Sequence, residues 1–252
     1  SISPYTFIVS LFLRLFGRKP VVYLQSDGYE EYKIILGKVG PFIYHLMFSI
    51  TVAISDIISC RDFILKGKKG KLISPSQLDS SWFRKFKLTD IKNFKLLYVG
   101  RIRIEKGIYS LLSIIKNKKN LFLTIVGAEK ETTYNIDHSN VKVLKQQNNK
   151  FKLIKYYDDH NIFILPSYTE GYPMVLLEAL SRRRPVIVFE DIKHVIGNKK
   201  GIFVSKRNFL SFFGTLNNIK KNYKKIQKEM KKNKLPTNKD FIEKLAKHID
   251  DF

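Results

Sequence analysis

The chain has 252 residues, of which 44% are hydrophobic and 27% charged, so its composition allows real cores and excludes an intrinsically disordered protein. Its formal net charge is +24, from 46 Lys and Arg against 22 Asp and Glu. Such a balance indicates an anionic partner, for example nucleic acid, an anionic membrane face or a phosphorylated substrate. The abundance of Lys, Ile, Asn and Phe equally indicates a compositional bias of the genome, in which case the charge marks no single binding patch.

The first third of the chain predicts one helix and three short strands. The apolar run from Tyr5 to Phe16 is interrupted by Arg14 and is too short to span a bilayer. We interpret it as an amphipathic helix that either packs on a core or docks on a membrane surface. The single cysteine, Cys60, excludes an intrachain disulfide, fits a reducing compartment and is expected to be a small buried residue. The strand-length apolar runs cover residues 21–24, 52–55 and 71–74.

The rest of the chain alternates expected strands with expected helices, after a polar stretch at residues 84–93 that we interpret as a linker. The expected strands are residues 96–99, 121–126, 141–144, 162–165 and 185–189, and the expected helices are residues 106–115, 151–157, 174–180, 210–230 and 239–249. Strands that alternate with helices form parallel sheets covered on both faces. The sequence therefore predicts an α/β protein with two doubly wound units over residues 1–88 and 89–235, and a C-terminal helix over residues 236–252.

Two features in the second half of the chain each allow two interpretations. The helix over residues 210–230 has apolar residues at a regular three and four spacing and a face rich in lysine, which is either a solvated face or an anion-binding one. Asp158 and Asp159 precede a histidine and then a strand, so we expect a helix end there and not a metal site.

Three loops follow expected strands of the second unit, and ligands of doubly wound sheets bind beyond the carboxyl ends of the strands. In the first loop Gly100 permits a sharp turn, and Arg101 and Lys106 either close on a diphosphate or are ordinary surface charges. In the second loop Gly127, followed by Ala128, lets a base or a phosphate approach the backbone. We expect the three loops to face one crevice.

The third loop and its helix, SYTEGYPMVLLEAL at residues 167–180, place two carboxylates in a stretch that is otherwise apolar or small. Pro173 suits the first turn of a helix, whose free N–H groups form an anion site. On the functional interpretation Glu170 reaches sugar hydroxyls and Glu178 accepts hydrogen bonds from a ribose diol. On the alternative one Glu170 is a helix-start carboxylate and Glu178 a surface residue.

Taken together, these segments resemble glycosyltransferase family 4, the retaining transferases of GT-B fold. The matching segments are LLYVGRIRIEKG (96–107), LTIVGA (123–128), NIFILPSYTEGYPMVLLEALSRRRPVIVF (161–189) and KHVIGNKKGIFV (193–204). Glu170 and Glu178 match the paired-glutamate motif of the family. Residues 20–78 resemble the second half of its N-terminal lobe, with Ser26 where the family often has a histidine. The resemblance implies two Rossmann-like lobes, of which the N-terminal one is expected to be truncated.

The resemblance implies an enzyme, a hexosyltransferase-like glycosyltransferase (EC 2.4). It would move a sugar from a nucleotide-diphosphate sugar to an acceptor hydroxyl with retention of configuration, in the synthesis of surface polysaccharide or glycolipid. The expected catalytic residues are Glu170, Arg101 and Lys106. The expected donor-binding residues are Gly100, Arg101, Lys106, Gly127, Ala128, Glu170, Gly171, Tyr172, Pro173, Met174, Val175 and Glu178. No cofactor and no metal are expected, because the cations and the helix start neutralise the leaving diphosphate.

The expected partners are the nucleotide-sugar donor, a glycan or lipid-linked acceptor, and an anionic membrane surface docked by residues 7–16 and the lysine-rich helix. The expected location is cytoplasmic or peripheral on the inner membrane face. One alternative is a non-catalytic nucleotide-sugar-binding subunit, or a fragment that needs a missing N-terminal part, as the short first unit and Ser26 suggest. Another is a nucleic-acid-binding protein, but it rests on charge alone without a recognised motif, so nucleic acid is not an expected partner.

Overall fold

The computed structural model describes residues 1–87, 89–116, 118, 120–128 and 139–250, and the chain divides by its contacts into two compact units. Unit 1 comprises Ser1–Gln77, Thr169–Tyr172 and Pro236–Phe252, and unit 2 comprises Leu78–Tyr168 and Pro173–Leu235. The contacts thus group residues 236–252 with unit 1 and change unit after Gln77, whereas the sequence suggested a boundary at residue 88 and a separate C-terminal helix.

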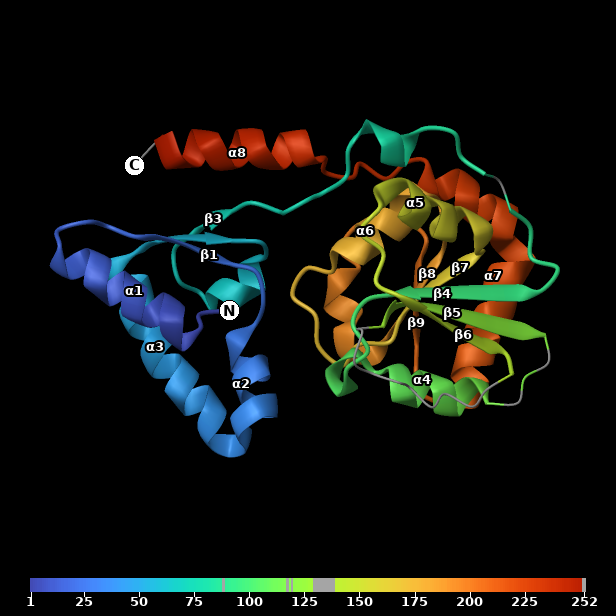
Figure 1. Ribbon diagram of the computed structural model, residues 1–252, viewed down its shortest axis with the longest axis horizontal. Coiled ribbons are helices and arrows are strands. Elements are labelled where there is room, and N and C mark those ends of the chain that lie inside the picture. Colours follow the sequence, from blue (N-terminus) through green and yellow to red (C-terminus); the bar gives the residue numbers. More distant parts are fainter. Residues whose placement is uncertain (88, 117, 119, 129–138, 251–252) are drawn as a thin grey trace. The chain divides into compact units, whose positions relative to one another are not determined.

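Unit 1 is a small parallel sheet of three strands with helices around it (Figure 1). The strands lie in the order β1-β2-β3, and all pairs in the sheet are parallel. The strands are β1 (Val21–Leu24), β2 (Asp56–Ser59) and β3 (Lys71–Leu72), and the α-helices are α1 (Pro4–Leu15), α2 (Gly28–Leu36), α3 (Gly40–Ile54) and α8 (Asn238–Asp250). Short 3₁₀ turns are η1 (Gly37–Val39) and η2 (Asp62–Leu65).

The strand expected at residues 52–55 is wrong, because these residues end helix α3 and the strand starts at Asp56. The inward side chains Tyr44, Met47, Phe48 and Thr51 follow the three and four spacing of a helix, and all are buried. The helix period therefore continues to the end of the apolar run, and an apolar run by itself does not distinguish a buried helix from a strand.

Cys60 lies in the core of unit 1, as expected, at 2% exposure. Its thiol donates to the carbonyl of Gln25 at 3.3 Å, and burial raises the pKa of the Cys60 thiol to about 11. A thiol with so high a pKa is protonated at neutral pH and is a poor nucleophile, which confirms the expectation of a structural cysteine.

Helix α1 forms over the apolar run near the start, with Ser3 as the N-cap that accepts from the backbone of Thr6. Phe7 packs against the core of unit 1. Most of the other large apolar side chains of α1 are exposed, so core packing does not account for the apolar character of this helix.

Unit 2 is a doubly wound sheet of six parallel strands in the order β6-β5-β4-β7-β8-β9 (Figure 1). Renumbered from its first strand, this is the 3-2-1-4-5-6 order of a nucleotide-binding sheet. The strands are β4 (Phe94–Val99), β5 (Leu121–Ala128), β6 (Val141–Lys145), β7 (Ile162–Leu165), β8 (Val186–Phe189) and β9 (Ile202–Ser205), and the α-helices are α4 (Ile108–Ile115), α5 (Lys150–Asp159), α6 (Met174–Ser181) and α7 (Phe209–Met230). Its 3₁₀ turns are η3 (Ser80–Phe83), η4 (Ile104–Lys106) and η5 (Glu190–Val195).

The strands and helices expected in unit 2 are confirmed to within a few residues, with three differences. Strand β9 was not expected, and helix α4 starts at Ile108 instead of residue 106, because Gly107 interrupts the chain with a left-handed backbone. In helix α7 the buried face was predicted to begin at Leu210, which is wrong: Leu210 is 82% exposed, whereas Phe212 is fully buried. The lysines of α7 are exposed, as a solvated face requires.

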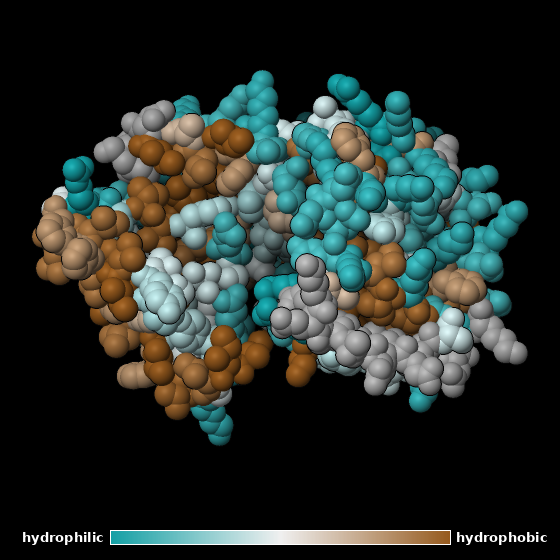
Figure 2. All heavy atoms as spheres, in the orientation of Figure 1, coloured by the Kyte–Doolittle hydropathy of each residue, from teal (hydrophilic) through white to brown (hydrophobic). Residues whose placement is uncertain are grey.

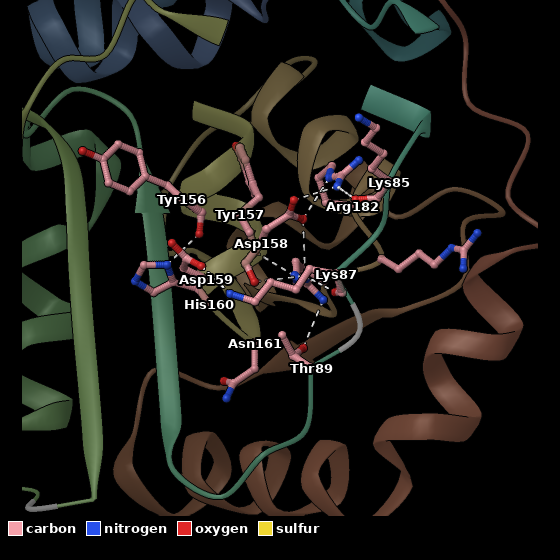
Figure 3. A network of polar contacts seen from close by, with 12 residues as sticks. Lys85, Lys87, Thr89, Tyr156, Tyr157, Asp158, Asp159, His160, Asn161 and Arg182 are labelled. Carbon is pink, nitrogen blue, oxygen red and sulfur yellow. Dashed lines mark hydrogen bonds and ion pairs between the residues drawn. The ribbon is translucent and has the colours of Figure 1, made fainter. Parts of the chain in front are cut away.

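The stretch at residues 84–93 is not a free linker, because two buried arginines hold its backbone against unit 2 (Figure 3). Arg182 donates to the carbonyls of Trp82, Arg84 and Lys85 at 2.8 to 3.0 Å. Arg184 donates to the carbonyl of Lys87 at 2.7 Å. The sequence shows the polarity of this stretch but not these two partners, which lie about a hundred residues further along the chain.

Asp158 is the counter-ion of both arginines and lies near the end of helix α5, where a helix end was expected. Its carboxylate accepts from Arg182 at 2.7 Å and 3.0 Å and from Arg184 at 3.4 Å. A buried guanidinium without a carboxylate partner is strongly destabilising. Asp158 therefore has a structural role, as the counter-ion of Arg182 and Arg184.

Candidate functional site

The switch point of the unit 2 sheet lies between β4 and β7, where the strand order reverses, and the loops after these two strands meet there. Gly107 has φ +66°, and a Cβ atom on it would lie 1.9 Å from the carbonyl oxygen of Pro166. The N–H of Tyr168 donates to the carbonyl of Glu105 at 2.9 Å. The two loops therefore touch along their backbones, which only glycine at position 107 allows.

The loops after β4 and β5 are equally close, through the two predicted glycines. Gly100 has φ +150° and Gly127 has φ +142°, and a Cβ atom on Gly127 would lie 2.0 Å from the carbonyl oxygen of Gly100. The N–H of Gly100 donates to Val126 at 3.0 Å. Ala128 follows at the end of β5 and is half-buried. Close packing of the two strand ends explains Gly127, and the Tyr98 hydroxyl, 2.8 Å from where a Cβ on Gly100 would lie, explains Gly100. The role of both glycines in donor binding stays a prediction.

The two predicted cations sit on the loop that these glycines shape. Arg101 is exposed, and Lys106 is half-buried in the turn η4. The hydroxyl of the buried Tyr98 donates to the carbonyl of Arg101 at 2.8 Å. Tyr98 therefore fixes the backbone from which Arg101 extends, a role that its position inside an apolar strand did not suggest.

The start of helix α6 follows the β7 loop in the sequence. Pro173 is the N-cap of this helix, one position before the first helical residue, Met174. Met174 and Val175 are half-buried. The side chain of proline carries no acceptor for the free N–H groups of the first turn, so these groups and the helix dipole suit an external anion.

Glu178 is buried in helix α6, at 1% exposure, which corrects the alternative that makes it a surface residue. The hydroxyl of Tyr157, from helix α5, donates to its Oε2 at 2.7 Å. Burial raises the pKa of Tyr157 well above its ordinary value, and the neighbouring carboxylate of Glu178 raises it further. Tyr157 thus stays a protonated donor, and it positions the carboxylate that the sequence assigned to ribose binding.

The remaining predicted residues, Glu170, Gly171 and Tyr172, belong by their contacts to unit 1. A Cβ atom on Gly171 would lie 2.4 Å from the carbonyl oxygen of Gln25 and 2.7 Å from Cα of Ser26, so this loop lies against the chain that follows β1. The ring of Tyr172 packs on the core of unit 1, with the Arg61 guanidinium 5.1 Å from its centre. Within unit 1 the structure therefore brings Gly171 next to Ser26. Glu170 and Tyr172 belong to the same unit, and the remaining predicted site residues belong to unit 2.

Arg207 is a residue of this region that the sequence did not single out. It lies between β9 and α7, and its guanidinium donates to the carbonyl of Ser167 at 2.7 Å, to Oγ of Ser110 at 2.9 Å and to Asp191 at 2.8 Å. It also lies 3.8 Å from the centre of the Tyr168 ring. Arg207 therefore fixes the loop after β7. A lone arginine in so basic a chain gives no signal of such a role.

Among the described residues, no group of three or more His, Cys, Asp or Glu side chains is placed to hold a metal ion. The expectation that the reaction needs no metal remains a prediction.

Comparison with known proteins agrees with this arrangement. A family model described as glycosyl transferases group 1 matches residues 79–235. The capsular polysaccharide biosynthesis glycosyltransferase CapM of Staphylococcus aureus is 33% identical over 130 residues, which cover 46% of this chain and 34% of CapM. The amylovoran biosynthesis glycosyltransferase AmsD of Erwinia amylovora is 32% identical over 178 residues, which cover 64% of this chain and 48% of AmsD. The chain spans about a quarter to a half of the length of the curated relatives it matches.

Solved structures share the fold over almost the whole chain at low identity. HepE of Anabaena, in complex with UDP-glucose, has a TM-score of 0.71 and 14% identity and covers 99% of this chain and 77% of its own. Sucrose-phosphate synthase from Thermosynechococcus elongatus has a TM-score of 0.72 and 16% identity and covers 98% of this chain and 71% of its own. The parallel sheets with their helices match these GT-B structures. Since the family model covers more than half of the chain, including all of the unit 2 sheet, the protein belongs to the glycosyl transferases group 1 and has the GT-B fold.

Proposed function

We propose that the protein is a retaining glycosyltransferase of family 4 type that moves a sugar from a nucleotide-diphosphate sugar to an acceptor hydroxyl, in surface polysaccharide or glycolipid synthesis. The observation that carries the proposal is the meeting of the β4 and β7 loops at the switch point of the unit 2 sheet. Dinucleotide and nucleotide ligands bind at such a point in doubly wound sheets. The relatives CapM and AmsD support it, because both are named for polysaccharide synthesis, and HepE supports it as a structure solved with UDP-glucose.

The chemistry of the proposal is electrostatic. Departure of the sugar leaves negative charge on the nucleotide diphosphate, and fixed positive groups lower the barrier where that charge develops. Arg101 offers a planar fork of donors and Lys106 a point charge, and the first turn of α6 adds free N–H groups. On this proposal Glu178 holds the ribose diol and Glu170 contacts the transferred sugar, and no metal takes part.

Binding is tested first, by thermal unfolding with UDP, GDP, ADP and their sugars. A ligand that binds only the folded state stabilises it by about 2.7 kcal/mol at one hundred times its Kd, so the matching nucleotide raises Tm above the others. Replacing Arg101 and Lys106 by alanine is expected to weaken nucleotide diphosphate binding by about a hundredfold or more, since each charge-assisted hydrogen bond contributes about 1.5–3 kcal/mol. The matched control replaces two exposed lysines of α7, Lys220 and Lys221, and keeps wild-type affinity.

Turnover is tested separately, by release of the nucleotide and by the anomeric configuration of the product. Glu170→Gln is expected to abolish transfer while the protein remains folded. Full activity of Glu170→Gln, or of the Arg101→Ala and Lys106→Ala double variant, would contradict the proposal.

The second candidate is a nucleotide-sugar-binding protein without catalysis, favoured by two observations: unit 1 has three strands among its described residues, and Ser26 stands where the family often has a histidine. It gives the same thermal shifts but no product from this chain alone. Transfer regained when upstream sequence of the parent gene is added would identify a part of a larger enzyme, and its continued absence would favour the binding protein.

A further inference from the structure

Unit 1 exposes large apolar side chains at the turn where helix α2 passes through η1 into helix α3, a segment we call the hairpin tip (residues 33–46). Phe42 is 74% exposed and Ile35 is 73% exposed, which is unusual for side chains of this size. Figure 2 shows apolar surface gathered over the helices of unit 1. The exposed apolar residues of the hairpin tip are Ile34, Ile35, Leu36, Val39, Phe42, Ile43 and Leu46.

Helix α1 in the same unit has the same character. Apart from Arg14 in its last turn, the exposed large side chains of α1 are apolar. Arg18 and Lys19 follow its end, and Lys19 is ion-paired with Asp56 at 2.6 Å. The exposed apolar residues of α1 and the residue after it are Tyr5, Ile8, Val9, Phe12, Leu13, Leu15 and Phe16. A helix with apolar residues on its buried and its exposed sides is typical of a fully buried or a membrane-associated helix.

The charged residues of the hairpin tip itself are basic, and the carboxylates of α2, Glu30 and Glu31, lie one turn before it. The hairpin tip carries Lys33 and Lys38, and the sequence has no Asp or Glu in residues 1–26 or in residues 32–55. An apolar surface whose outermost charged side chains are lysine and arginine matches the interface of an anionic bilayer, where apolar side chains enter the headgroup boundary and cations contact the anionic lipids. A second copy of the chain fits less well, because a two-fold contact would place these cations against each other.

The hairpin tip is also shaped to lie on a bilayer and not to cross it. Residues Gly28–Ile54 are long and apolar enough to span a membrane by length and composition, as are many buried helices and signal sequences. In the structure this stretch bends at Gly37, which has φ +64°, and the helices touch where a Cβ on Gly40 would lie 2.0 Å from the carbonyl oxygen of Tyr32. The inward face of α3 is held in the core of unit 1 through Tyr44 and Phe48, each 1% exposed.

We propose that the hairpin tip, supported by the apolar and cationic face of α1, docks unit 1 on an anionic lipid bilayer. The proposal does not rest on the transferase reaction, and its test measures no activity. It differs from docking through the lysine-rich face of α7, which carries charge without a comparable set of exposed apolar side chains.

The test is co-sedimentation of the full chain with vesicles of phosphatidylcholine, alone or with phosphatidylglycerol. Wild-type protein is expected to bind the anionic vesicles more tightly. Ile35→Ser with Phe42→Ser is expected to lower the partition coefficient about tenfold or more, since each change removes a large exposed apolar group that docking would bury in the bilayer. The matched control, Phe151→Ser with Leu210→Ser, changes residues of unit 2 that are 67% and 82% exposed and is expected to bind as wild type.

A second pair tests the charge. Lys33→Glu with Lys38→Glu is expected to weaken binding to anionic vesicles and to leave binding to neutral ones unchanged. Circular dichroism confirms that each variant is folded. Equal binding by wild type and the Ile35→Ser, Phe42→Ser variant, or no binding of wild type to anionic vesicles, would overturn the proposal. So would a dimer in lipid-free solution that this variant dissociates, or protein that resists alkaline carbonate extraction, because these results indicate a second copy or a membrane span.

Discussion

The hydroxyl of Tyr157 donates a 2.7 Å hydrogen bond to Oε2 of Glu178, and neither side chain is more than 1% exposed. This bond joins helix α5 to helix α6 and gives a donor to a carboxylate that lies out of water. Burying a charged group without such partners is costly. Glu178 is therefore held in place before any ligand arrives.

Tyr157→Phe removes that donor and keeps the ring. Because the buried carboxylate loses this hydrogen bond, the free energy of unfolding is expected to fall by about 1–3 kcal/mol. Urea denaturation measures the loss, and Tyr156→Phe, at the neighbouring half-buried tyrosine, serves as the control that changes little. If Glu178 binds the donor, Tyr157→Phe also weakens nucleotide binding. A variant as stable as wild type would show that the bond contributes nothing.

Gly107→Ala tests the contact between the β4 and β7 loops. The new Cβ would meet the carbonyl oxygen of Pro166 at 1.9 Å, in a backbone conformation that already disfavours alanine. Gly67→Ala is the matched control, because Gly67 has φ +78° with nothing within 4 Å of its Cβ position.

The control is expected to cost about 1–2 kcal/mol of stability from the left-handed backbone alone. Gly107→Ala is expected to cost more and to reduce nucleotide binding, because the two loops must move apart. An equal loss of stability in the two variants would mean that the β4 and β7 loops move apart without strain.

Arg207→Gln tests whether this arginine positions the loop after β7. The change removes the guanidinium that bonds Ser167, Ser110 and Asp191, so we expect lower nucleotide affinity and a loss of stability of about 1–3 kcal/mol. Asp191→Asn, which weakens the ion pair alone, separates the two roles. It is expected to keep most of the affinity, because the bond from Arg207 to the Ser167 carbonyl remains. Unchanged donor affinity and KM in Arg207→Gln would exclude the positioning role.

His160 predicts a pH dependence of stability. Burial lowers the pKa of His160 below its ordinary value of 6.5. Its Nδ1 lies 2.6 Å from the carbonyl of Tyr156 and its Nε2 lies 2.8 Å from Oγ1 of Thr124, which suits a neutral ring that donates to the carbonyl and accepts from the hydroxyl. Below pH 6.5 His160 is protonated in the unfolded chain but stays neutral in the folded chain until the pH reaches its lowered pKa.

The contribution of the neutral His160 to the free energy of unfolding is thus fully present above pH 6.5. It is lost as the pH falls toward the lowered pKa of His160 in the folded state. Urea denaturation between about pH 5 and pH 8 measures it. In His160→Gln the decline toward acid is expected to be shallower than in wild type. Parallel curves for the two proteins would assign the acid sensitivity to other groups.

The element pattern of unit 2 was largely readable from local sequence. Strand β7 was predicted at its observed bounds, because a run of four buried apolar residues before Pro166 has no competing period. The end of α3 was misassigned because a short apolar run fits both a strand and a buried helix. Strand β9 was missed because its apolar run, Ile202 to Val204, is only three residues long and shorter than the segments taken as strands.

Residues of the candidate site could be predicted from the sequence where the type of a single residue indicates its role. Gly100 and Gly127 mark strand ends, Arg101 and Lys106 lie on the loop after β4, and the resemblance singled out Glu170 and Glu178. What each residue contacts was not readable, and the structure shows that Glu178 is buried against Tyr157 and that Gly171 lies against the chain after β1.

The sequence by itself determined the alternation of strands and helices, the loops that carry glycines and cations, and the buried cysteine, because these follow from periodicity and residue chemistry within a short stretch. Only the tertiary structure decided which of these stretches touch: Arg182 with the backbone of residues 82–85, Gly107 with Pro166, and Arg207 with Ser167. Each of these contacts joins residues far apart in the chain. The hydrogen bonds and close approaches that fix them depend on how the sheet brings those residues together, which no local pattern specifies.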